Sequence, residues 1–461
     1  MKTLIKNATI VTSTAEYTGN LLIADGKIQA ISKDASYDAD ETIDAEGKWL
    51  MPGAIDPHVH LEMPFMGTYS SDDYASGTLA ALHGGTTTVI DFILQTQGDT
   101  LANALKSWRS RSDDRCYCDY SFHMAVTDFN DDVAEEVKHF IENEGITSFK
   151  TFMAYKGALM LDDGQMTALM KVVSQNGGMV TVHATNGDVI DNLIAKHKSE
   201  GKLAPLYHYL SQPEVTEAEA SSRFCDLAHY ADVPAYIVHM TCEGAVEAIR
   251  KSYHRNQIVQ GETCIQYLIL DASLYEKNFE GAKWVMSPPL REKKDQEYLW
   301  SAINQGIINV VATDHCPFTW EKKLLGKDDF SKIPNGHPAI EHRVELLHSE
   351  GVAKGKISKQ KMVEVLSTNP ARIFGLAPQK GDIAIGADAD LVIFDPNKKH
   401  TLSAKTHHMN VDYSCYEGWE VTGKCETVFL RGKKVIDKGE TLIEPGFGEY
   451  QKRSKVSWKR S

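Results

Sequence analysis

Eight short apolar runs dominate the middle of the chain, and stretches with the spacing of amphipathic helices separate them. Such alternation is typical of βαβ units, in which helices join parallel strands. Eight units favour a (β/α)8 TIM barrel, because no G-x-G-x-x-G motif follows the early strands. The pattern alone leaves a doubly wound open sheet as an alternative. The runs lie at residues 54–56, 86–92, 120–126, 147–152, 179–184, 235–240, 258–262 and 309–314.

The two ends of the chain share a different pattern. Residues 1 to 51 alternate apolar and polar side chains between Gly and Asp residues, and this pattern returns after residue 375. It predicts antiparallel strands with tight turns. We expect a small β-sandwich domain from residues 1–51 and 375–445, with a catalytic barrel, residues 52–374, inserted between its halves. Residues 446–461 carry five Lys or Arg, which predicts an exposed C-terminal tail or a subunit-contact arm.

The charge balance limits the partners of this protein. Its 461 residues include 49 Lys and Arg against 63 Asp and Glu, a net charge of −14, whereas nucleic acid and anionic membranes attract a basic surface. No 18 apolar residues run together, and Lys6 and Asn7 interrupt the first apolar stretch, so we expect no membrane span and no secretory signal. Eight Cys are too few for a disulfide scaffold. We expect a cytoplasmic protein that acts on a small molecule or another protein.

Side chains that can bind metals close several predicted strands, at the end where barrel enzymes keep their catalytic groups. His58 and His60 lie two residues apart, so both leave the first strand on the same side. His183, His239 and Asp314 each close another strand. A single His in such a place is as often a core residue, but four imidazoles and a carboxylate are hard to attribute to packing. The pattern favours a metal site.

Lys150 lies inside the apolar run ITSFKTF. A buried ammonium is costly unless it is paired or neutral, so one reading is a lysine that reaches solvent or a carboxylate. The other is an amine of lowered pKa that reacts with carbon dioxide, giving a carbamate able to bridge two metals. With four neutral His, Asp314 and a bridging hydroxide, a carbamate nearly balances two divalent cations. Zinc suits these donors best, and manganese or cobalt are alternatives.

Short motifs follow one another along essentially the whole chain: DPHVH (56–60), FKTFMAYK (149–156), VHA (182–184), IVHM (237–240), GETC (261–264), SPPLR (287–291), ATDHCP (312–317), PNG (334–336) and NPARIFGL (369–376). In this order they resemble the cyclic amidohydrolases, and most of all the dihydropyrimidinase and hydantoinase branch. The resemblance implies that Tyr155, Ser287 and Asn335 hold a cyclic substrate and its oxyanion. It also implies two metal ions, with Lys150 carbamylated, and a ligand set of His58, His60, Lys150, His183, His239 and Asp314.

The resemblance also implies a reaction, the hydrolysis of a cyclic amide to an N-carbamoyl amino acid. A hydroxide held between the metals attacks the ring amide carbon. Tyr155 donates to the oxyanion, and Asp314 takes the hydroxide proton and returns it to the departing nitrogen. Members of the family are usually tetramers, so we expect a homo-oligomer.

The segment after His60 indicates a neutral substrate. Dihydroorotases and allantoinases commonly carry an Arg two positions after the second His, and Glu62 stands there in this chain. Met63, Phe65 and Met66 suit a ring with a hydrophobic substituent, although core packing is an equal alternative for them. We therefore expect dihydropyrimidines or 5-substituted hydantoins as substrates, with allantoin as the runner-up.

Three departures from the family pattern leave the ligand set complete. Thr185 stands where relatives usually have Glu, Ile265 where GETC is usually followed by Pro, and Ala339 where Gly is common. Thr185 lies close to His183, so we expect it to alter the surroundings of that ligand or the substrate preference. Collapsin response mediator proteins share the fold but are assembly partners with an incomplete ligand set. The complete set favours an enzyme over such a scaffold.

Overall fold

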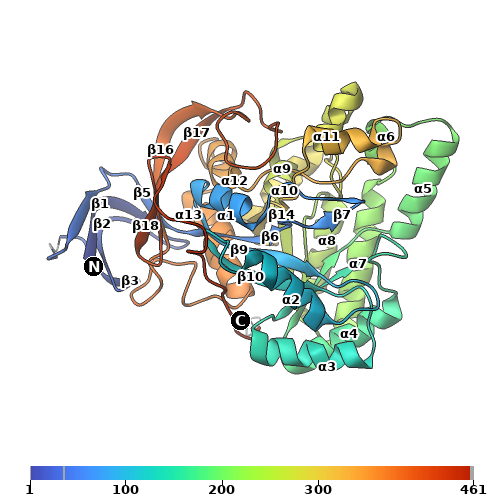
Figure 1. Ribbon diagram of the computed structural model, residues 1–461, viewed down its shortest axis with the longest axis horizontal. Coiled ribbons are helices and arrows are strands. Elements are labelled where there is room, and N and C mark those ends of the chain that lie inside the picture. Colours follow the sequence, from blue (N-terminus) through green and yellow to red (C-terminus); the bar gives the residue numbers. More distant parts are fainter. Residues whose placement is uncertain (1, 35–36, 457–461) are drawn as a thin grey trace.

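A barrel of parallel strands forms the body of the protein (Figure 1). The computed structural model describes residues 2–34 and 37–456. Within them, eight strands pair in parallel in the order of the sequence, and a bridge between Val59 and His315 closes the ring. The predicted barrel and its eight runs are confirmed. The strands are β6 (Ala54–Val59), β9 (Thr86–Leu94), β10 (Asp119–Ala125), β11 (Ser148–Phe152), β12 (Met179–His183), β13 (Ala235–Ile237), β14 (Val259–Cys264) and β15 (Ile308–Ala312).

Helices join the barrel strands and cover their outer face (Figure 1). In α4, the Asp162 carboxylate accepts from the backbone N–H of Gln165, and Gly177 ends the helix at a φ of 80°. The carboxylate satisfies an N–H that a helix start leaves free, and glycine adopts this left-handed conformation without strain. The helices are α1 (Tyr74–His83), α2 (Leu101–Ser112), α3 (Asp131–His139), α4 (Asp163–Asn176), α5 (Gly187–Ser199), α6 (Leu206–Leu210), α7 (Glu214–Ala231), α8 (Glu243–Tyr253), α9 (Ile265–Ile269), α10 (Lys293–Asn304), α11 (Trp320–Lys323), α12 (Arg343–Leu347), α13 (Lys359–Val363) and α14 (Asn369–Ile373).

The two chain ends build one mixed sheet beside the barrel (Figure 1). Its central strand β5 (Trp49–Pro52) pairs in parallel with β1 (Lys2–Val11) and antiparallel with β16 (Leu391–Thr401). The backbone hydrogen bonds of β5 therefore join the N-terminal and C-terminal strands into one continuous sheet. The remaining strands are β2 (Glu16–Ala24), β3 (Lys27–Ser32), β4 (Glu41–Asp44), β17 (Glu420–Leu430), β18 (Lys433–Asp437) and β19 (Glu440–Thr441).

A buried arginine joins the first and last barrel strands. Arg343 donates to the carbonyl oxygens of Ile55 and Val311, both at 3.0 Å, and to Oγ1 of Thr86 at 3.1 Å. Its guanidinium is fully buried, where an unpaired polar group would be costly. These bonds fix β6, β9 and β15 against one another. The same strands carry His58 and lead to Asp314.

The C-terminal segment packs on the barrel. Gln451 donates its N–H to the carbonyl of Tyr120, near the start of β10. Arg453 is only 4% exposed and donates to Oγ of Ser121 and Oγ of Ser148. Within residues 446–456 of the predicted tail or arm, this basic side chain thus finds acceptors on the barrel of its own chain, while several neighbouring residues are exposed. The rest of the predicted tail, residues 457–461, lies outside the described residues.

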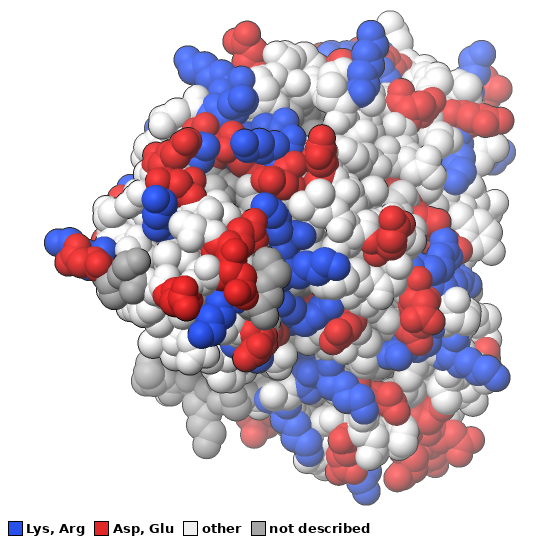
Figure 2. Space-filling model, turned by 60° about the vertical axis from the view of Figure 1, so that its left-hand side comes forward, with Lys and Arg blue, Asp and Glu red and all other residues white. Residues whose placement is uncertain are grey.

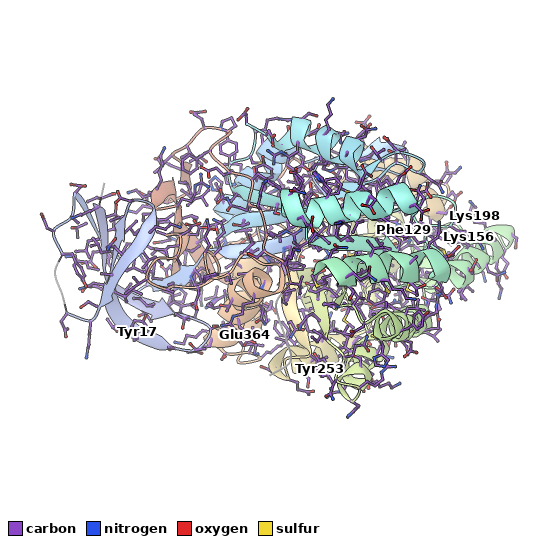
Figure 3. The ribbon with its side chains drawn as sticks, turned by 90° about the horizontal axis from the view of Figure 1, so that it is seen from below. Tyr17, Phe129, Lys156, Lys198, Tyr253 and Glu364 are labelled. Carbon is purple, nitrogen blue, oxygen red and sulfur yellow. The ribbon has the colours of Figure 1, made fainter. Side chains whose placement is uncertain are left out.

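The barrel opens away from the mixed sheet. Figure 3 shows Tyr17 of the mixed sheet and Lys156, which follows β11, at opposite ends of the molecule. The loops that follow the barrel strands therefore lie on the far side from the sheet. Among these loops, a hairpin of β7 (Pro64–Phe65) and β8 (Thr68–Tyr69) follows β6.

The surface seen in Figure 2 carries charges of both signs, and the cysteines, all within the described residues, form no disulfides. Acidic and basic side chains alternate over the face in Figure 2, where the mixed sheet comes forward. In the part of the chain that is described, no helix combines the length and the apolar character that crossing a bilayer requires. All eight cysteines are free thiols, and each is buried.

Candidate functional site

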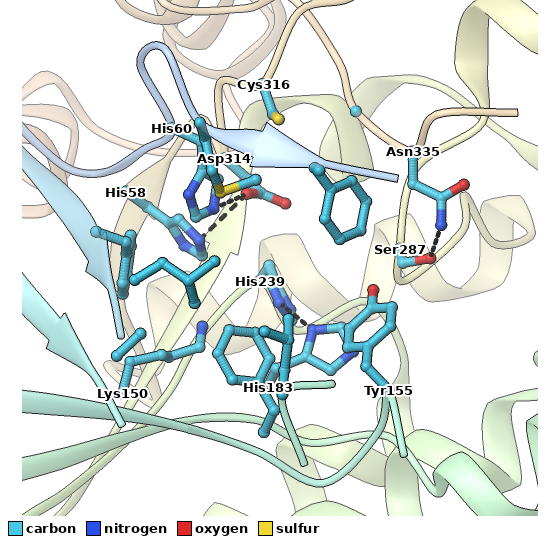
Figure 4. A pocket seen from close by; sticks show the side chains of 18 of the residues that line it. His58, His60, Lys150, Tyr155, His183, His239, Ser287, Asp314, Cys316 and Asn335 are labelled. Carbon is cyan, nitrogen blue, oxygen red and sulfur yellow. Dashed lines mark hydrogen bonds and ion pairs between the residues drawn. The ribbon is translucent and has the colours of Figure 1, made fainter. Parts of the chain in front are cut away.

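Three donor groups converge at the carboxyl ends of β6 and β15. Nε2 of His58 and Nε2 of His60 each lie 3.1 Å from Oδ1 of Asp314 (Figure 4). One ligand atom from each residue lies within 4.8 Å of the others. Burial opposes ionisation, but the charges of His58 and His60 hold the pKa of Asp314 well below its usual range. Two imidazoles and an ionised carboxylate form a site that suits a divalent cation.

A second pair of imidazoles lies across the same pocket. Nδ1 of His183, the last residue of β12, is 2.8 Å from Nε2 of His239, which follows β13 (Figure 4). Burial lowers the pKa of His183 to about 3 and that of His239 well below its ordinary value. Both rings are therefore neutral at pH 7, and a neutral imidazole carries the one nitrogen lone pair that a metal requires.

Lys150 extends from β11 into the space between these groups (Figure 4). Its side chain is 2% exposed, and Nζ lies 4.8 Å from the ring centre of Phe92 and 5.3 Å from that of Phe152. Burial lowers its pKa to about 8, although Glu262 and Asp314 act in the opposite direction. An appreciable fraction of this amine is therefore neutral near pH 7, and a neutral amine is the form that adds to carbon dioxide.

Glu262 supports two of the donor groups. Its Oε1 lies 2.6 Å from Nδ1 of His58 and accepts the backbone N–H of His239 at 3.0 Å. Tyr236 donates its hydroxyl to the other oxygen. Burial alone would lower the pKa of His58, but Glu262 and Asp314 raise it to about 9. Glu262 lies in the GETC motif, but the sequence predicted no role for it. A carboxylate within a buried strand is the signal that could have found it.

The backbone at this site is strained. His239 has a φ of 39°, Asp314 of 51° and Tyr155 of 66°. Residues other than glycine rarely adopt such left-handed conformations, and those that do cluster at functional sites. For His239, the bond from its N–H to Glu262 helps to hold this conformation.

The three residues expected to hold the substrate line the same pocket. Tyr155 is half-buried, with its ring centre 5.3 Å from that of His183. Nδ2 of Asn335 donates to Oγ of Ser287 at 3.0 Å (Figure 4). Burial raises the pKa of Tyr155, so its hydroxyl keeps its proton and is a hydrogen-bond donor at pH 7. The structure thus brings together every residue that the sequence assigned to the site.

An apolar outer pocket of about 440 Å³ adjoins this inner one and shares Tyr155, Ser287 and Asn335 with it. Phe65 lies between the two, 5.9 Å from the Tyr155 ring. The outer lining contains no Lys or Arg among the described residues. Its apolar members are Pro64, Phe65, Met66, Leu94, Ala154, Ala158, Leu159, Ile190, Ile194 and Phe330. Met63, Phe65 and Met66, which follow His60, therefore line cavities, as expected if they contact a substrate.

Comparison with known proteins identifies this arrangement. The model of the amidohydrolase family matches residues 49–435. The D-hydantoinase of Geobacillus stearothermophilus is 49% identical over 457 residues, covering 99% of this chain and 97% of that protein. The chain belongs to the dihydropyrimidinase and D-hydantoinase family of amidohydrolases. As a member of this family, it is a hydrolase.

The family relationship extends to the whole structure. The crystal structure of dihydropyrimidinase from Brevibacillus agri NCHU1002 superimposes with a TM-score of 0.98 at 46% identity, covering 99% of this chain and all of that one. The dihydropyrimidinase of Rattus norvegicus is 38% identical over 455 residues, covering 97% of this chain and 88% of that protein. Both the barrel and the mixed sheet are thus features of this family.

The three departures from the family pattern occupy different places around the site. Oγ1 of Thr185 lies 2.9 Å from Nε2 of His183, so this side chain contacts the imidazole directly. Ala339 donates its N–H to Nδ1 of His315, the residue after Asp314. Ile265 is fully buried at the start of α9. Of the three, Thr185 is therefore the one with a direct hydrogen bond to a metal-binding candidate.

Proposed function

We propose that this protein is a binuclear metal hydrolase that opens the ring of 5-substituted hydantoins and dihydropyrimidines to N-carbamoyl amino acids. The observation that carries the proposal is the convergence of two donor groups, His58, His60 and Asp314 on one side and His183 and His239 on the other, with the buried amine of Lys150 between them. Membership of the family supports the same reaction.

The residues present fit two divalent cations. His58, His60 and Asp314 would hold one, His183 and His239 the other, and a carbamate on Lys150 would join them. Imidazole nitrogens with carboxylate oxygens suit zinc best, and manganese and cobalt are alternatives. The environment of Lys150 supports the carbamate, because an unmodified ammonium there is buried and, among the described residues, forms no ion pair.

The side chains of the pocket divide the work of catalysis. When bound, two such cations supply a hydroxide at neutral pH and polarise the amide carbonyl. Asp314, held ionised, accepts the proton of the attacking hydroxide and returns it to the departing ring nitrogen. Tyr155 donates its hydroxyl to the oxygen that becomes negative in the transition state. Ser287 and Asn335 bind the ring and orient it toward Asp314 and Tyr155.

The outer pocket selects the substituent on the ring. Its apolar lining favours a hydrophobic group at the ring carbon, and among the described residues no Lys or Arg of that lining offers a carboxylate a cationic partner. Hydantoins with an aromatic or aliphatic group at position 5 therefore match the cavity best. Dihydroorotate, which is anionic, matches it least.

One experiment ranks these substrates directly. The protein is loaded with zinc, manganese or cobalt and incubated with phenylhydantoin, dihydrouracil, allantoin and dihydroorotate, and ring opening is followed. We expect phenylhydantoin and dihydrouracil to be opened. No ring opening by metal-loaded protein on any of the four would overturn the proposal, and near-zero metal content after purification would favour a scaffold.

Assembly and location are part of the same proposal. Family resemblance predicts a cytoplasmic homotetramer, and light scattering of the purified protein measures the number of chains directly. A mass near 51.2 kDa, that of one chain, would contradict the oligomer.

A further inference from the structure

A buried lysine outside the ligand set joins the two segments that carry Ser287 and Asn335. Lys323, the last residue of α11, is fully buried. Its Nζ donates to the carbonyl oxygen of Val285 at 2.9 Å, of Pro334 at 2.8 Å and of Gly336 at 3.0 Å. Pro334 and Gly336 flank Asn335, and Val285 lies two residues before Ser287. One ammonium thus contacts both segments.

The number of acceptors matches the charged form of the amine. An ammonium has three N–H donors and a neutral amine has two, so only the cation serves all three carbonyls. Burial lowers the pKa of Lys323 to about 7, although Cys415 and Cys316 act in the opposite direction. Among the described residues Lys323 forms no ion pair, so these carbonyls are its polar partners.

The bonds from Lys323 determine how the peptide groups around Asn335 point. The C=O and N–H of a trans peptide point in opposite directions. The carbonyl of Pro334 faces Lys323, so the N–H of Asn335 faces away from it. The N–H of Gly336 donates to the carbonyl of Val285, which lies on the Lys323 side, so the carbonyl of Asn335 also faces away. The backbone N–H and C=O of Asn335 are thereby both directed away from Lys323. Asn335 itself lines the inner pocket.

A side chain that only filled the space of Lys323 would not need a positive charge. A methionine of similar volume would fill the space without the desolvation cost of an ammonium, but it would remove the donor that these three carbonyls share. The contribution specific to Lys323 is the alignment of three carbonyls on two loops. Those loops meet through the bond from Asn335 to Ser287.

The geometry points to Lys323 as a positioning residue, whose ammonium holds Ser287 and Asn335 in the arrangement that binds the cyclic substrate. This inference rests on the proposed function, because it assigns those two residues to the ring. It adds a residue that touches no substrate and no metal-binding candidate. Its effect should therefore appear in substrate binding and leave metal loading unchanged.

The test compares Lys323→Met with Lys380→Met. Lys380 is also buried, but it pairs with Asp119 and Asp390, away from the pocket. For each variant, metal content, melting temperature, KM and kcat are measured with phenylhydantoin. Lys323→Met is expected to keep its metals and to raise KM about tenfold or more. Lys380→Met is expected to lose stability while KM stays within about twofold of the wild type.

A structural role alone would give a different result. Partial unfolding lowers the active fraction, and hence kcat, without changing KM. Lys323→Gln, which keeps two N–H donors, should give an intermediate KM, and it serves as the test variant if Lys323→Met does not fold. A KM within twofold of the wild type in the variant that folds would overturn the inference. Wild-type protein that opens no ring would instead overturn the proposed function.

Discussion

Oε1 of Glu262 lies 2.6 Å from Nδ1 of His58, and this contact leaves Nε2 of the same ring directed at Asp314. A carboxylate on the far nitrogen fixes the tautomer of a histidine and makes its other nitrogen a better ligand. Both side chains are buried, so water cannot replace either partner. Glu262 therefore supports the proposed metal site through its contacts with His58 and with the backbone of His239.

Replacing this carboxylate should weaken metal binding. Glu262→Gln keeps the shape but removes the charge, so we expect a loss of about 10-fold to 100-fold in metal affinity. Competition with a chelator, followed by metal analysis, measures it. Tyr236→Phe, which removes only the hydroxyl that donates to Glu262, is the control and should lose less. Unchanged affinity in Glu262→Gln would show that the contact has no such role.

Removing the Tyr155 hydroxyl should slow the chemical step. Tyr155→Phe is expected to lower kcat by about 100-fold or more, as the loss of one oxyanion donor does, with a smaller change in KM. Tyr69, which is 53% exposed in the β7–β8 hairpin, provides the control. Tyr69→Phe should retain its kcat. Equal activity of the two variants would refute the oxyanion role.

The charge on Lys150 should make metal-free protein less stable below pH 8. Its folded pKa of about 8 lies below the ordinary value of 10.5, so the unfolded chain binds more protons between these two values. Stability of the wild type therefore rises with pH across this window. Lys150→Met removes the cost and should be more stable at pH 7 by up to about 3 kcal/mol, a gap that closes near pH 10.

Denaturant unfolding of metal-free protein, with carbon dioxide excluded, checks this pH dependence. Lys380→Met is the matched control, because there Asp390 and Asp388 outweigh burial and raise the pKa of the lysine. It should be destabilised at pH 7. A Lys150→Met variant less stable than the wild type at pH 7 would contradict the account of this buried amine.

The Thr185 hydroxyl should affect one metal more than the other. Thr185→Val removes the oxygen that lies 2.9 Å from Nε2 of His183 and conserves the side-chain shape. We expect about tenfold weaker binding of the cation assigned to His183 and His239. Metal titration should then show one tight and one weakened site. Two sites of wild-type affinity would mean that this contact does not tune the ligand.

The outer pocket should act on the ring substituent alone. Ile194 of α5 lines the outer pocket but not the inner one. Ile194→Ala is expected to lower kcat/KM for phenylhydantoin about tenfold, the typical effect of lost apolar contacts, and to leave dihydrouracil nearly unchanged. Leu210→Ala, at an exposed leucine outside both linings, is the control. Equal losses on both substrates would contradict this specificity.

The metal-binding candidates could be predicted from the sequence because most of them lie at the ends of apolar strands. Apolar runs that finish in His183, His239 or Asp314 predict both the barrel and the donors, since parallel strands bring their carboxyl ends together. Glu262, a carboxylate inside the buried strand β14, could have been recognised in the same way. The barrel and the donor residues therefore needed no three-dimensional information beyond strand order.

Contacts made by loops and by the C-terminal segment were not predictable in this way. Lys323 lies in a charged sequence, WEKK, and nothing there indicates that three carbonyls of two distant loops surround it. The directions of carbonyl groups depend on loop conformation, which no periodicity encodes. Arg453 looked like part of a solvated basic tail, because its acceptors, Ser121 and Ser148, lie more than 300 positions earlier in the chain.

The central claim is that a carbamate on Lys150 joins two cations in one pocket. Metal analysis of zinc-loaded protein, combined with carbon-13 NMR after exchange into labelled bicarbonate, tests it most directly. The account predicts two zinc ions per chain and a carbamate signal, both lost in Lys150→Met. Two tightly bound ions in Lys150→Met, or a wild type with no carbamate signal, would contradict it.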